Sequence, residues 1–508
     1  MGPPPSDGHK EAATLPQRPR FRLALPKRAA RRVGAFLLAL LVAGCGSSPA
    51  SAPSGAASPT PTAGASTAGI NVPADGFQGV VVAPEPQAAL IGQQVLAAGG
   101  DAADAAVAMG LALSVTLPSR VGLGGAGACL AFIPGARAPD GGVPQAVLFT
   151  PQAAAIPPAA AAAADRPAAL PLLPRGLYLL HARYGRLPFE ALVAPAEELA
   201  RFGTPASHAL VRDLDVVAGP LFADPAARAV FGPGGRPLAV GAILREPELA
   251  ATLGRIRVAG VGDFYQGALA RLVVSGSAAA GGPIAADALR RALPSLGAPL
   301  VVPFGNDRVA FLPPPADGGL AAAAAFQTLA HDPRALAQAA SRALAAAATW
   351  RRGGVTPQAV LAGNLPAAGL PPLPASATFL AVDRAGGAVA CATTMDNLFG
   401  TGRMVPGLGF LLAASPARTP PPLLAAGLAW NPNLHAFRAA VGGSGQAGAG
   451  LAVAVAMDNA LRSGQPMPVA VPEPGRANVA ACSRYLPGDG GVCSGVADPR
   501  GDGMAAGG

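Results

Sequence analysis

The feature that most constrains the fold is a strand–turn–strand pattern at residues 379–394. Residues 379–382 (FLAV) form an apolar run, residues 383–387 (DRAGG) supply turn residues, and residues 388–394 (AVACATT) form a second apolar run. An aspartate and two glycines between two such runs are typical of a β-hairpin, because the turn needs residues that tolerate positive φ. We therefore expect an antiparallel hairpin in the last third of the chain.

Polar residues mark the open end of this hairpin. Ser376 precedes the first strand, while Thr394 and Asp396 stand at the end of the second. Antiparallel pairing places the start of one strand beside the end of the other, so the hairpin brings Ser376 next to Thr394 and Asp396. The group would give a nucleophile with polar neighbours at one sheet edge. An ordinary core hairpin is the alternative.

Helical patterns dominate the first two thirds of the chain. Asp101 can cap a helix that runs to about Val115 and is apolar on nearly every face, which predicts a buried helix. The glycine loop at residues 122–127 contains the pattern G-x-G-x-x-G. A dinucleotide site needs a helix after such glycines, whereas a strand-like run at residues 129–133 follows here. We therefore reject a dinucleotide site.

The positive charge of the chain is concentrated at its N-terminus. The formal net charge is +9 over 508 residues, and residues 1–44 hold eight basic and two acidic residues, or +6. The remainder therefore carries only +3 (9 − 6), and it is dispersed. This distribution argues against a nucleic-acid partner.

The first 44 residues have the form of an export signal. A basic flank precedes an apolar run at residues 33–43, which is too short to span a bilayer. Residues 41–45 (LVAGC) resemble a bacterial lipobox, which would make Cys45 a lipidation site and the new N-terminus. The alternative is a plain secretory signal in which Cys45 is incidental.

Two segments outside the expected domain are poor in large apolar residues. Residues 45–77 are rich in Ser, Pro and Ala, and we expect a disordered tether because they cannot bury enough surface to fold. Residues 471–508 are glycine-rich, and we expect a tail. Together with the lipidation signal, the tether predicts an exported, periplasmic protein anchored to a membrane by its lipid. We expect the outer membrane, since no aspartate follows Cys45.

The order of several motifs resembles the γ-glutamyltransferase family over residues 78–465. The segments that carry the resemblance are residues 99–108, 115–118, 122–125, 180–189, 244–265 and 312–319, followed by the hairpin. The resemblance implies an α/β (α+β) fold, a four-layer αββα sandwich of the N-terminal nucleophile hydrolase type, for residues 78–470. It also implies self-cleavage, no cofactor, and a small γ-glutamyl peptide or amide such as glutathione as substrate.

The resemblance also implies roles for particular residues. The family's nucleophile falls on Ser376, so cleavage would occur between residues 375 and 376. Thr394 matches the threonine that contacts the nucleophile, and Asp396 stands where the family has a substrate-binding asparagine. The oxyanion-hole glycine pair falls on Gly445 and Gln446. A freed α-amine with a pKa near 8 could serve as the general base for the hydroxyl.

Several family residues are missing. Thr150 stands where the family places an arginine that holds the glutamyl carboxylate, and a hydroxyl cannot replace a bidentate guanidinium. The family's acidic pair is absent around residues 411–415, and its paired serines around residues 424–426. Three interpretations stay open: an active γ-glutamyltransferase, an amidase of altered specificity, and an uncleaved envelope lipoprotein or binding component without activity.

The cysteines suggest structural roles. Cys129 and Cys391 lie in apolar runs and are expected to be buried thiols. Cys482 and Cys493 could close a small loop in an oxidising compartment, or could remain free thiols in the tail. No cluster of His, Cys and Asp has the spacing of a metal site. The sequence leaves the oligomeric state open.

Overall fold

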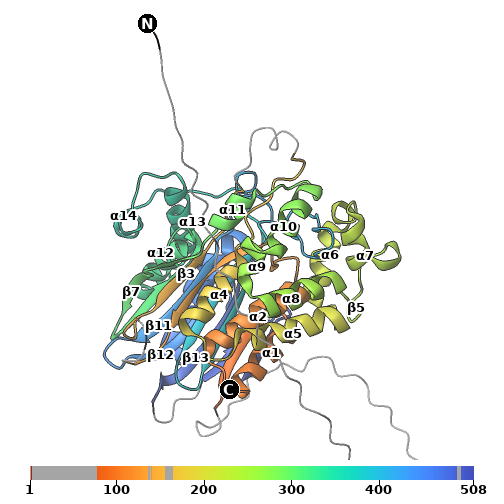
Figure 1. Ribbon diagram of the computed structural model, residues 1–508. Helices are drawn as coiled ribbons and strands as arrows, with labels where there is room; N and C mark the ends of the chain where they lie inside the picture. The colour runs from red at the N-terminus through yellow and green to blue at the C-terminus, as the bar shows by residue number, and fades with distance from the viewer. Residues whose placement is uncertain (1, 3–76, 136–137, 139, 155–163, 489–492) are drawn as a thin grey trace, which may run out of the picture. The chain divides into compact units, whose positions relative to one another are not determined.

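The structure is a computed structural model that describes residues 2, 77–135, 138, 140–154, 164–488 and 493–508 (Figure 1). The expected signal and lipidation site, and the expected tether up to residue 76, lie outside this part of the chain apart from Gly2. In the part that is described, no helix combines the length and the apolar character that crossing a membrane requires.

Two antiparallel sheets form the centre of the folded domain (Figure 1). The seven-stranded sheet has the order β15 (Met504–Gly507), β1 (Gly79–Ala83), β9 (Ala377–Asp383), β10 (Ala388–Thr394), β2 (Ala126–Phe132), β3 (Gln145–Phe149) and β6 (Ser295–Gly297). The six-stranded sheet has the order β14 (Cys493–Val496), β13 (Arg476–Leu486), β12 (Ala436–Ser444), β11 (Ala425–Asn431), β8 (Asp307–Phe311) and β7 (Leu300–Phe304). A small separate pair joins β4 (Thr204–Pro205) and β5 (Ile243–Leu244).

Helices cover the outer face of each sheet. The seven-stranded sheet is covered by α1 (Pro86–Ala97), α2 (Ala102–Thr116) and α4 (Leu173–Tyr184), and the six-stranded sheet by α12 (Asp317–His331) and α15 (Ala449–Ser463). Next to α12 lie α13 (Leu336–Arg351) and α14 (Pro357–Ala362). The remaining helices are α5 (Phe189–Phe202), α6 (His208–Leu221), α7 (Pro225–Phe231), α8 (Pro247–Ala259), α9 (Val261–Gln266), α10 (Ala268–Ala279) and α11 (Ala286–Arg291).

Apolar side chains between the two sheets form the central core. Leu380 and Val382 of β9 pack in one buried cluster with Leu428 of β11 and Phe437 of β12. Further buried clusters lie between each sheet and its helices. The predicted four-layer αββα sandwich is therefore confirmed.

The buried helix α2 begins with the expected cap. The Asp101 carboxylate accepts hydrogen bonds from the backbone N–H groups of Ala103 and Asp104, both at 3.0 Å. The Asp104 carboxylate accepts in return from the Asp101 N–H at 3.2 Å, which completes a capping box. Every residue of α2 is buried, as its apolar pattern predicted.

The C-terminal segment 471–508 is not a tail. It contributes β13 and β14 to the six-stranded sheet and β15 to the edge of the seven-stranded sheet. β15 pairs with β1 from Val80↔Gly507 to Ala83↔Met504. Alanine, glycine and serine make up about half of the residues in these strands. Because alanine and glycine carry little strand propensity, the order of the strands depends on pairing with their neighbours.

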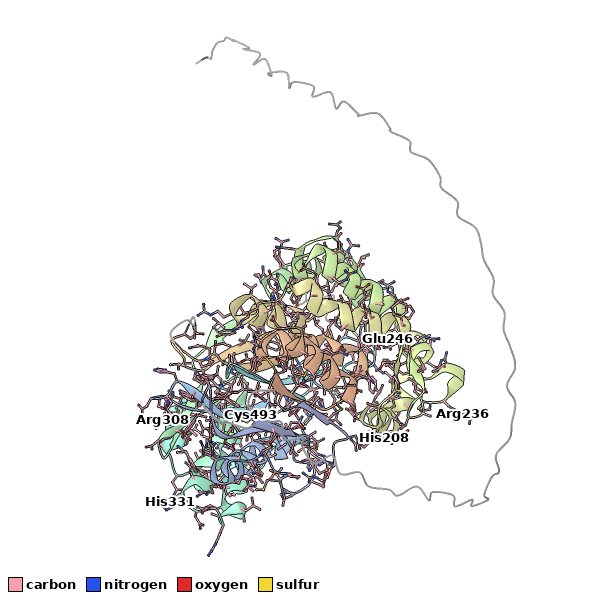
Figure 2. All side chains as sticks on the ribbon, turned by 90° about the horizontal axis from the view of Figure 1, so that it is seen from below. His208, Arg236, Glu246, Arg308, His331 and Cys493 are labelled. Carbon is pink, nitrogen blue, oxygen red and sulfur yellow. A yellow bond between two sulfur atoms is a disulfide. The ribbon has the colours of Figure 1, made fainter. Side chains whose placement is uncertain are left out.

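All four cysteines of the folded domain form disulfides. Cys129 of β2 lies directly opposite Cys391 of β10 and is bonded to it, so the expectation of two buried thiols is wrong. The strand register explains the bond, since it joins residues that are 262 positions apart in the sequence. Cys482 of β13 is bonded to Cys493 of β14, and Figure 2 labels Cys493. The alternative of two free thiols in a tail is thereby excluded.

Candidate active site

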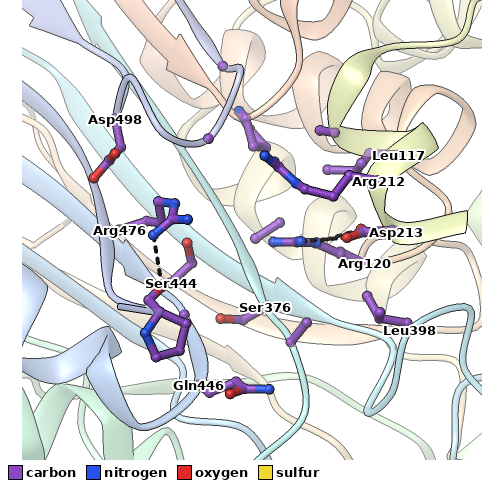
Figure 3. A pocket seen from close by; sticks show the side chains of 18 of the residues that line it. Leu117, Arg120, Arg212, Asp213, Ser376, Leu398, Ser444, Gln446, Arg476 and Asp498 are labelled. Atoms are coloured by element: carbon purple, nitrogen blue, oxygen red, sulfur yellow. Dashed lines mark hydrogen bonds and ion pairs between the residues drawn. The ribbon is translucent and has the colours of Figure 1, made fainter. Parts of the chain in front are cut away.

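Ser376 lies immediately before β9, at the edge of a pocket of about 340 Å³ (Figure 3). Only 1% of Ser376 is exposed, and its Oγ has no hydrogen-bond partner among the described residues. The pocket is lined by Pro84, Leu117, Arg120, Ala209, Arg212, Asp213, Val216, Ala375, Ser376, Ala377, Leu398, Ser444, Gly445, Gln446, Pro474, Arg476, Asn478, Asp498, Gly501 and Gly503. The Ser376 hydroxyl, which has no hydrogen-bond partner among the described residues, thus borders a space that could hold a small ligand.

Thr394 lies beside this serine through the strand register. Ala377 of β9 pairs with Thr393 of β10, so the residues before and after this pair are neighbours. The Thr394 hydroxyl donates to the carbonyl oxygen of Ala375 at 2.9 Å, and the Asp396 N–H donates to the Thr394 oxygen at 2.9 Å. The second bond directs the hydroxyl proton of Thr394 toward Ala375. The hairpin therefore brings Ser376 and Thr394 together, as predicted.

Gly445 and Gln446 are among the described residues that line the pocket. They follow β12 and have φ values of 97° and 52°, both in the left-handed region. A Cβ on Gly445 would lie 1.9 Å from the carbonyl oxygen of Pro474, so this position requires glycine. What Gly445 presents to the pocket can only be backbone, which is the chemistry that an oxyanion hole needs.

Asp396 is buried and is not among the described residues that line the pocket. It is 1% exposed, and neither of its carboxylate oxygens has a hydrogen-bond partner among the described residues. Burial without a compensating partner raises the pKa of Asp396 from 3.8 to about 8. The side chain is therefore mostly protonated at neutral pH. The structure places Asp396 next to Thr394 but outside the set of pocket-lining residues.

The family residues that the sequence lacks have no local substitutes. Thr150 is buried after β3 and is not among the described residues that line the pocket. Residues 411–415 carry no carboxylate, and their backbone forms isolated bridges to Gly124 and Ala168 instead. Residues 424–426 run into β11 and are buried. A γ-glutamyl group would therefore not meet the family's usual contacts at these positions.

Three arginines in the pocket wall were not predicted as site residues. Arg120 follows α2, Arg212 belongs to α6, and Arg476 begins β13. Figure 3 shows their side chains directed into the pocket that Ser376 borders. The one available signal in the sequence was the position of Arg120, a charged residue just before the glycine loop in an otherwise apolar stretch.

Arg120 is held in place by Asp213 of α6. Its Nε donates to Asp213 Oδ2 at 2.7 Å and its Nη2 to Oδ1 at 2.6 Å, while the Ser119 hydroxyl donates to Oδ2 at 2.6 Å. Burial lowers the pKa of Arg120, but the hydrogen bonds and charge of Asp213 outweigh it and leave the pKa raised. The guanidinium is therefore a fixed cation.

No metal-binding group of three or more His, Cys, Asp or Glu side chains occurs in the described part of the chain. The described lining of the pocket supplies hydroxyl, carboxylate, amide and guanidinium groups.

Comparison with known families gives a match over about half of the chain. A family model described as gamma-glutamyltranspeptidase matches residues 88–350. The matched segment includes the glycine loop and the helices that precede the hairpin. It ends before Ser376, so the hairpin itself lies beyond it.

Several curated proteins are similar to the same part of the chain. "Glutathione hydrolase 2" of Arabidopsis thaliana is 30% identical over 245 residues, which is 48% of this chain and 42% of that protein. "Glutathione hydrolase proenzyme" of Escherichia coli K12 is 29% identical over 257 residues (48% and 43%), and "Acylase ACY 1 proenzyme" of Pseudomonas sp. SE83 is 31% identical over 266 residues (49% and 47%). The chain thus spans less than half the length of these relatives.

A solved structure extends the likeness in fold to most of the chain. The cephalosporin acylase from Bacillus halodurans superposes with a TM-score of 0.70 and 21% identity, and the match covers 89% of this chain and 98% of that one. At this identity the superposition establishes the fold, which here includes the hairpin and the C-terminal strands.

Proposed function

This chain belongs to the gamma-glutamyltranspeptidase family, and on that premise we propose that it is a self-cleaving amide hydrolase or acyltransferase with Ser376 as nucleophile. The proposed substrate is a γ-glutamyl amide such as glutathione, or a close analogue of one. The observation that carries the proposal is the hydrogen bond from the Thr394 hydroxyl to the Ala375 carbonyl oxygen, because it polarises the bond that Ser376 must attack.

Self-cleavage begins with the Ser376 hydroxyl. Its oxygen attacks the carbonyl carbon of Ala375, and the negative charge that develops on the carbonyl oxygen is stabilised by the Thr394 hydroxyl. The C–N bond then breaks, and the proton lost from the hydroxyl goes to the nitrogen of Ser376, which leaves an ester between the two residues. Water hydrolyses this ester. The products are a carboxylate on Ala375 and a free α-amine on Ser376.

Substrate turnover uses the groups that cleavage releases. The α-amine of Ser376 accepts the hydroxyl proton as its oxygen attacks the substrate amide, and it passes the proton to the leaving amine. The backbone at Gly445 and Gln446 is proposed to stabilise the oxyanion. The resulting acyl ester of Ser376 is hydrolysed by water or transferred to an amino acid.

Two further parts of the proposal rest on the sequence. The apolar run at residues 33–43 and the lipobox-like residues 41–45 support export and lipidation at Cys45. Position 150 is a threonine instead of the arginine that the resemblance places there, which supports a substrate specificity different from that of the family's glutathione hydrolases.

Reducing electrophoresis and intact mass of the purified protein test the proposal. We expect two pieces that meet at the Ala375–Ser376 bond, release of nitroaniline from an acyl p-nitroanilide, and loss of both in Ser376→Ala. Thr378→Ala is the matched control, because Thr378 is an equally buried hydroxyl residue on β9. A chain that stays whole after prolonged incubation and reduction would contradict the proposal and favour an uncleaved binding protein.

A further inference from the structure

The charged residues around Ser376 suit the carboxylate of a γ-glutamyl group better than its ammonium. Such a group carries both a carboxylate and an ammonium at its α-carbon. The described lining of the pocket includes three arginines, Arg120, Arg212 and Arg476, and two acidic residues, Asp213 and Asp498. Whether the pocket can hold each end depends on which of these groups remain able to bind a ligand.

One edge of the Arg120 guanidinium binds Asp213, and the other edge is available to a ligand. Asp213 occupies Nε and Nη2, and Nη1 makes no hydrogen bond to any described residue. The Arg120 side chain is 25% exposed. In Figure 3 its guanidinium projects from Asp213 toward the middle of the pocket. An arginine fixed on one edge and accessible on the other is suited to bind a carboxylate.

Arg476 has a similar arrangement across the pocket. Its Nη1 donates to the Glu473 carboxylate at 2.6 Å and to the backbone carbonyls of Pro474 and Gly475. Its Nε and Nη2 make no hydrogen bond within the described part of the chain. In Figure 3 the side chains of Arg120 and Arg476 lie on either side of the Ser376 hydroxyl.

The two acidic residues of the lining are already engaged. Both oxygens of Asp213 accept from Arg120. Asp498 accepts from the backbone N–H of Ala477 and from the backbone and side chain of Arg500. Burial raises the pKa of Asp498, but the bonds to Arg500 and Ala477 outweigh it and leave the pKa lowered. An ammonium would therefore find no carboxylate without a partner in this lining, which disfavours its transfer from water.

We propose that the substrate is the amide of a dicarboxylic acyl group, in which Arg120 and Arg476 bind the distal carboxylate and no α-ammonium is required. The inference rests on the proposed function, and it names the substrate class of the same site. The carboxylate contact that the family places at the position of Thr150 is thus supplied from the loop after α2 and from the start of β13.

Three p-nitroanilides with the same acyl chain length separate the contribution of the substrate carboxylate from that of the ammonium. The glutaryl anilide carries the carboxylate alone, the γ-L-glutamyl anilide carries the carboxylate and the ammonium, and the pentanoyl anilide carries neither. We expect kcat/KM for the glutaryl anilide to exceed that for the pentanoyl anilide roughly tenfold or more, as a charged hydrogen bond would give. The γ-L-glutamyl anilide is expected to be slower than the glutaryl anilide.

Variants of the arginines test which side chains cause the preference for the glutaryl anilide. Arg120→Gln combined with Asp213→Asn removes one of the two cations without leaving a buried carboxylate unpaired. It should lower the kcat/KM preference for the glutaryl over the pentanoyl anilide roughly tenfold, leaving only the part that Arg476 supplies. Arg351→Gln with Asp317→Asn is the matched control. Arg351 also bonds Asp317 through Nε and Nη2, with side-chain exposures of 19% and 5% against 25% and 4% for Arg120 and Asp213. The control pair lies in α13 and α12, so the preference should persist.

A binding measurement decides the inference even if no anilide is turned over. Glutarate should raise the Tm of the protein in a concentration-dependent way, and pentanoate should not. The Arg120 and Asp213 double variant should show a clearly smaller shift at the same glutarate concentration. Equal effects of glutarate and pentanoate, or a preference for the γ-L-glutamyl group over the glutaryl group, would overturn the proposed substrate class. Absence of cleavage and of all turnover would instead refute the proposed function, while the glutarate shift would still test the arginines.

Discussion

The hydroxyl of Thr394 donates a hydrogen bond of 2.9 Å to the carbonyl oxygen of Ala375, the residue on the other side of the peptide bond from Ser376. The donor comes from the end of β10 and the acceptor precedes β9, so the hairpin itself holds the pair in register. A donor fixed before any reaction occurs needs no reorganisation when negative charge develops on the carbonyl oxygen.

Replacing Thr394 with valine should slow self-cleavage. Valine keeps the shape of threonine but removes the donor to Ala375, and the loss of one such donor typically lowers a rate by roughly 100- to 1000-fold. Thr394→Ser keeps the hydroxyl and should cleave at nearly the normal rate. Time courses on reducing gels measure both rates. A valine variant that cleaves as fast as the wild type would show that the hydrogen bond has no part in the reaction.

Replacing Gly445 with alanine should destabilise the protein and impair turnover. The new Cβ would lie 1.9 Å from the Pro474 carbonyl oxygen, so the backbone at the pocket wall must move. Gly234→Ala is the matched control, since Gly234 also has a positive φ, 78°, but no atom within 4 Å of the added Cβ. The control should lose only the roughly 1–2 kcal/mol that a left-handed alanine costs. Equal losses of Tm in the two variants would contradict the expected clash.

Replacing Asp396 with asparagine should raise stability most at alkaline pH. The folded protein retains the Asp396 proton up to a pKa of about 8, whereas the unfolded chain loses it near 3.8. Between these values the folded state binds more protons, so the contribution of this group to stability falls as pH rises through that window and is constant above it. Asparagine cannot ionise and removes this slope. The Tm gain of Asp396→Asn over wild type should therefore increase from pH 5 to pH 8.

A constant Tm gain across this range would contradict the raised pKa of Asp396. Asp458→Asn is a suitable control for the pH series, because Asp458 is also buried but both of its carboxylate oxygens accept a hydrogen bond from the Arg462 side chain.

Cleavage at Ala375–Ser376 should be invisible on a non-reducing gel. Cys129 lies before the cleaved bond and Cys391 after it, so their disulfide joins the two pieces. We expect one band without reductant and two bands with it. Replacing Cys129 and Cys391 with serine should release the pieces under both conditions, whereas replacing Cys482 and Cys493 should not, since both lie in the second piece. Two bands without reductant in the wild type would contradict this bond.

The sequence was sufficient to predict the layers and the hairpin because their signals are local or depend on motif order. The turn at residues 383–387 determines which residues of β9 and β10 pair, and this pairing brings Ser376 to Thr394. The motif order identified the family and, with it, the four-layer fold.

The arginines and the first disulfide required the tertiary structure. Arg120 owes its orientation to Asp213, which is 93 residues away on α6, and no local pattern links the two. Cys129 and Cys391 meet only because β2 and β10 are neighbours with one particular register. The strands after residue 475 were not predicted for a different reason. They mix alanine and glycine with polar residues and lie among glycine-rich turns, so their strand signal is weak until a partner strand fixes them.

The position of β1 has a consequence for the order of folding and of the proposed self-cleavage. This strand comes from the part of the chain before Ala375, yet it lies between β9 and β15, which both come from the part after it. Neither piece can complete the seven-stranded sheet alone, and the Thr394 contact that prepares the bond exists only within that sheet. If the chain cleaves itself as proposed, it must therefore assemble first and cut itself afterwards, and we expect two separately synthesised pieces to fail to reconstitute the folded domain.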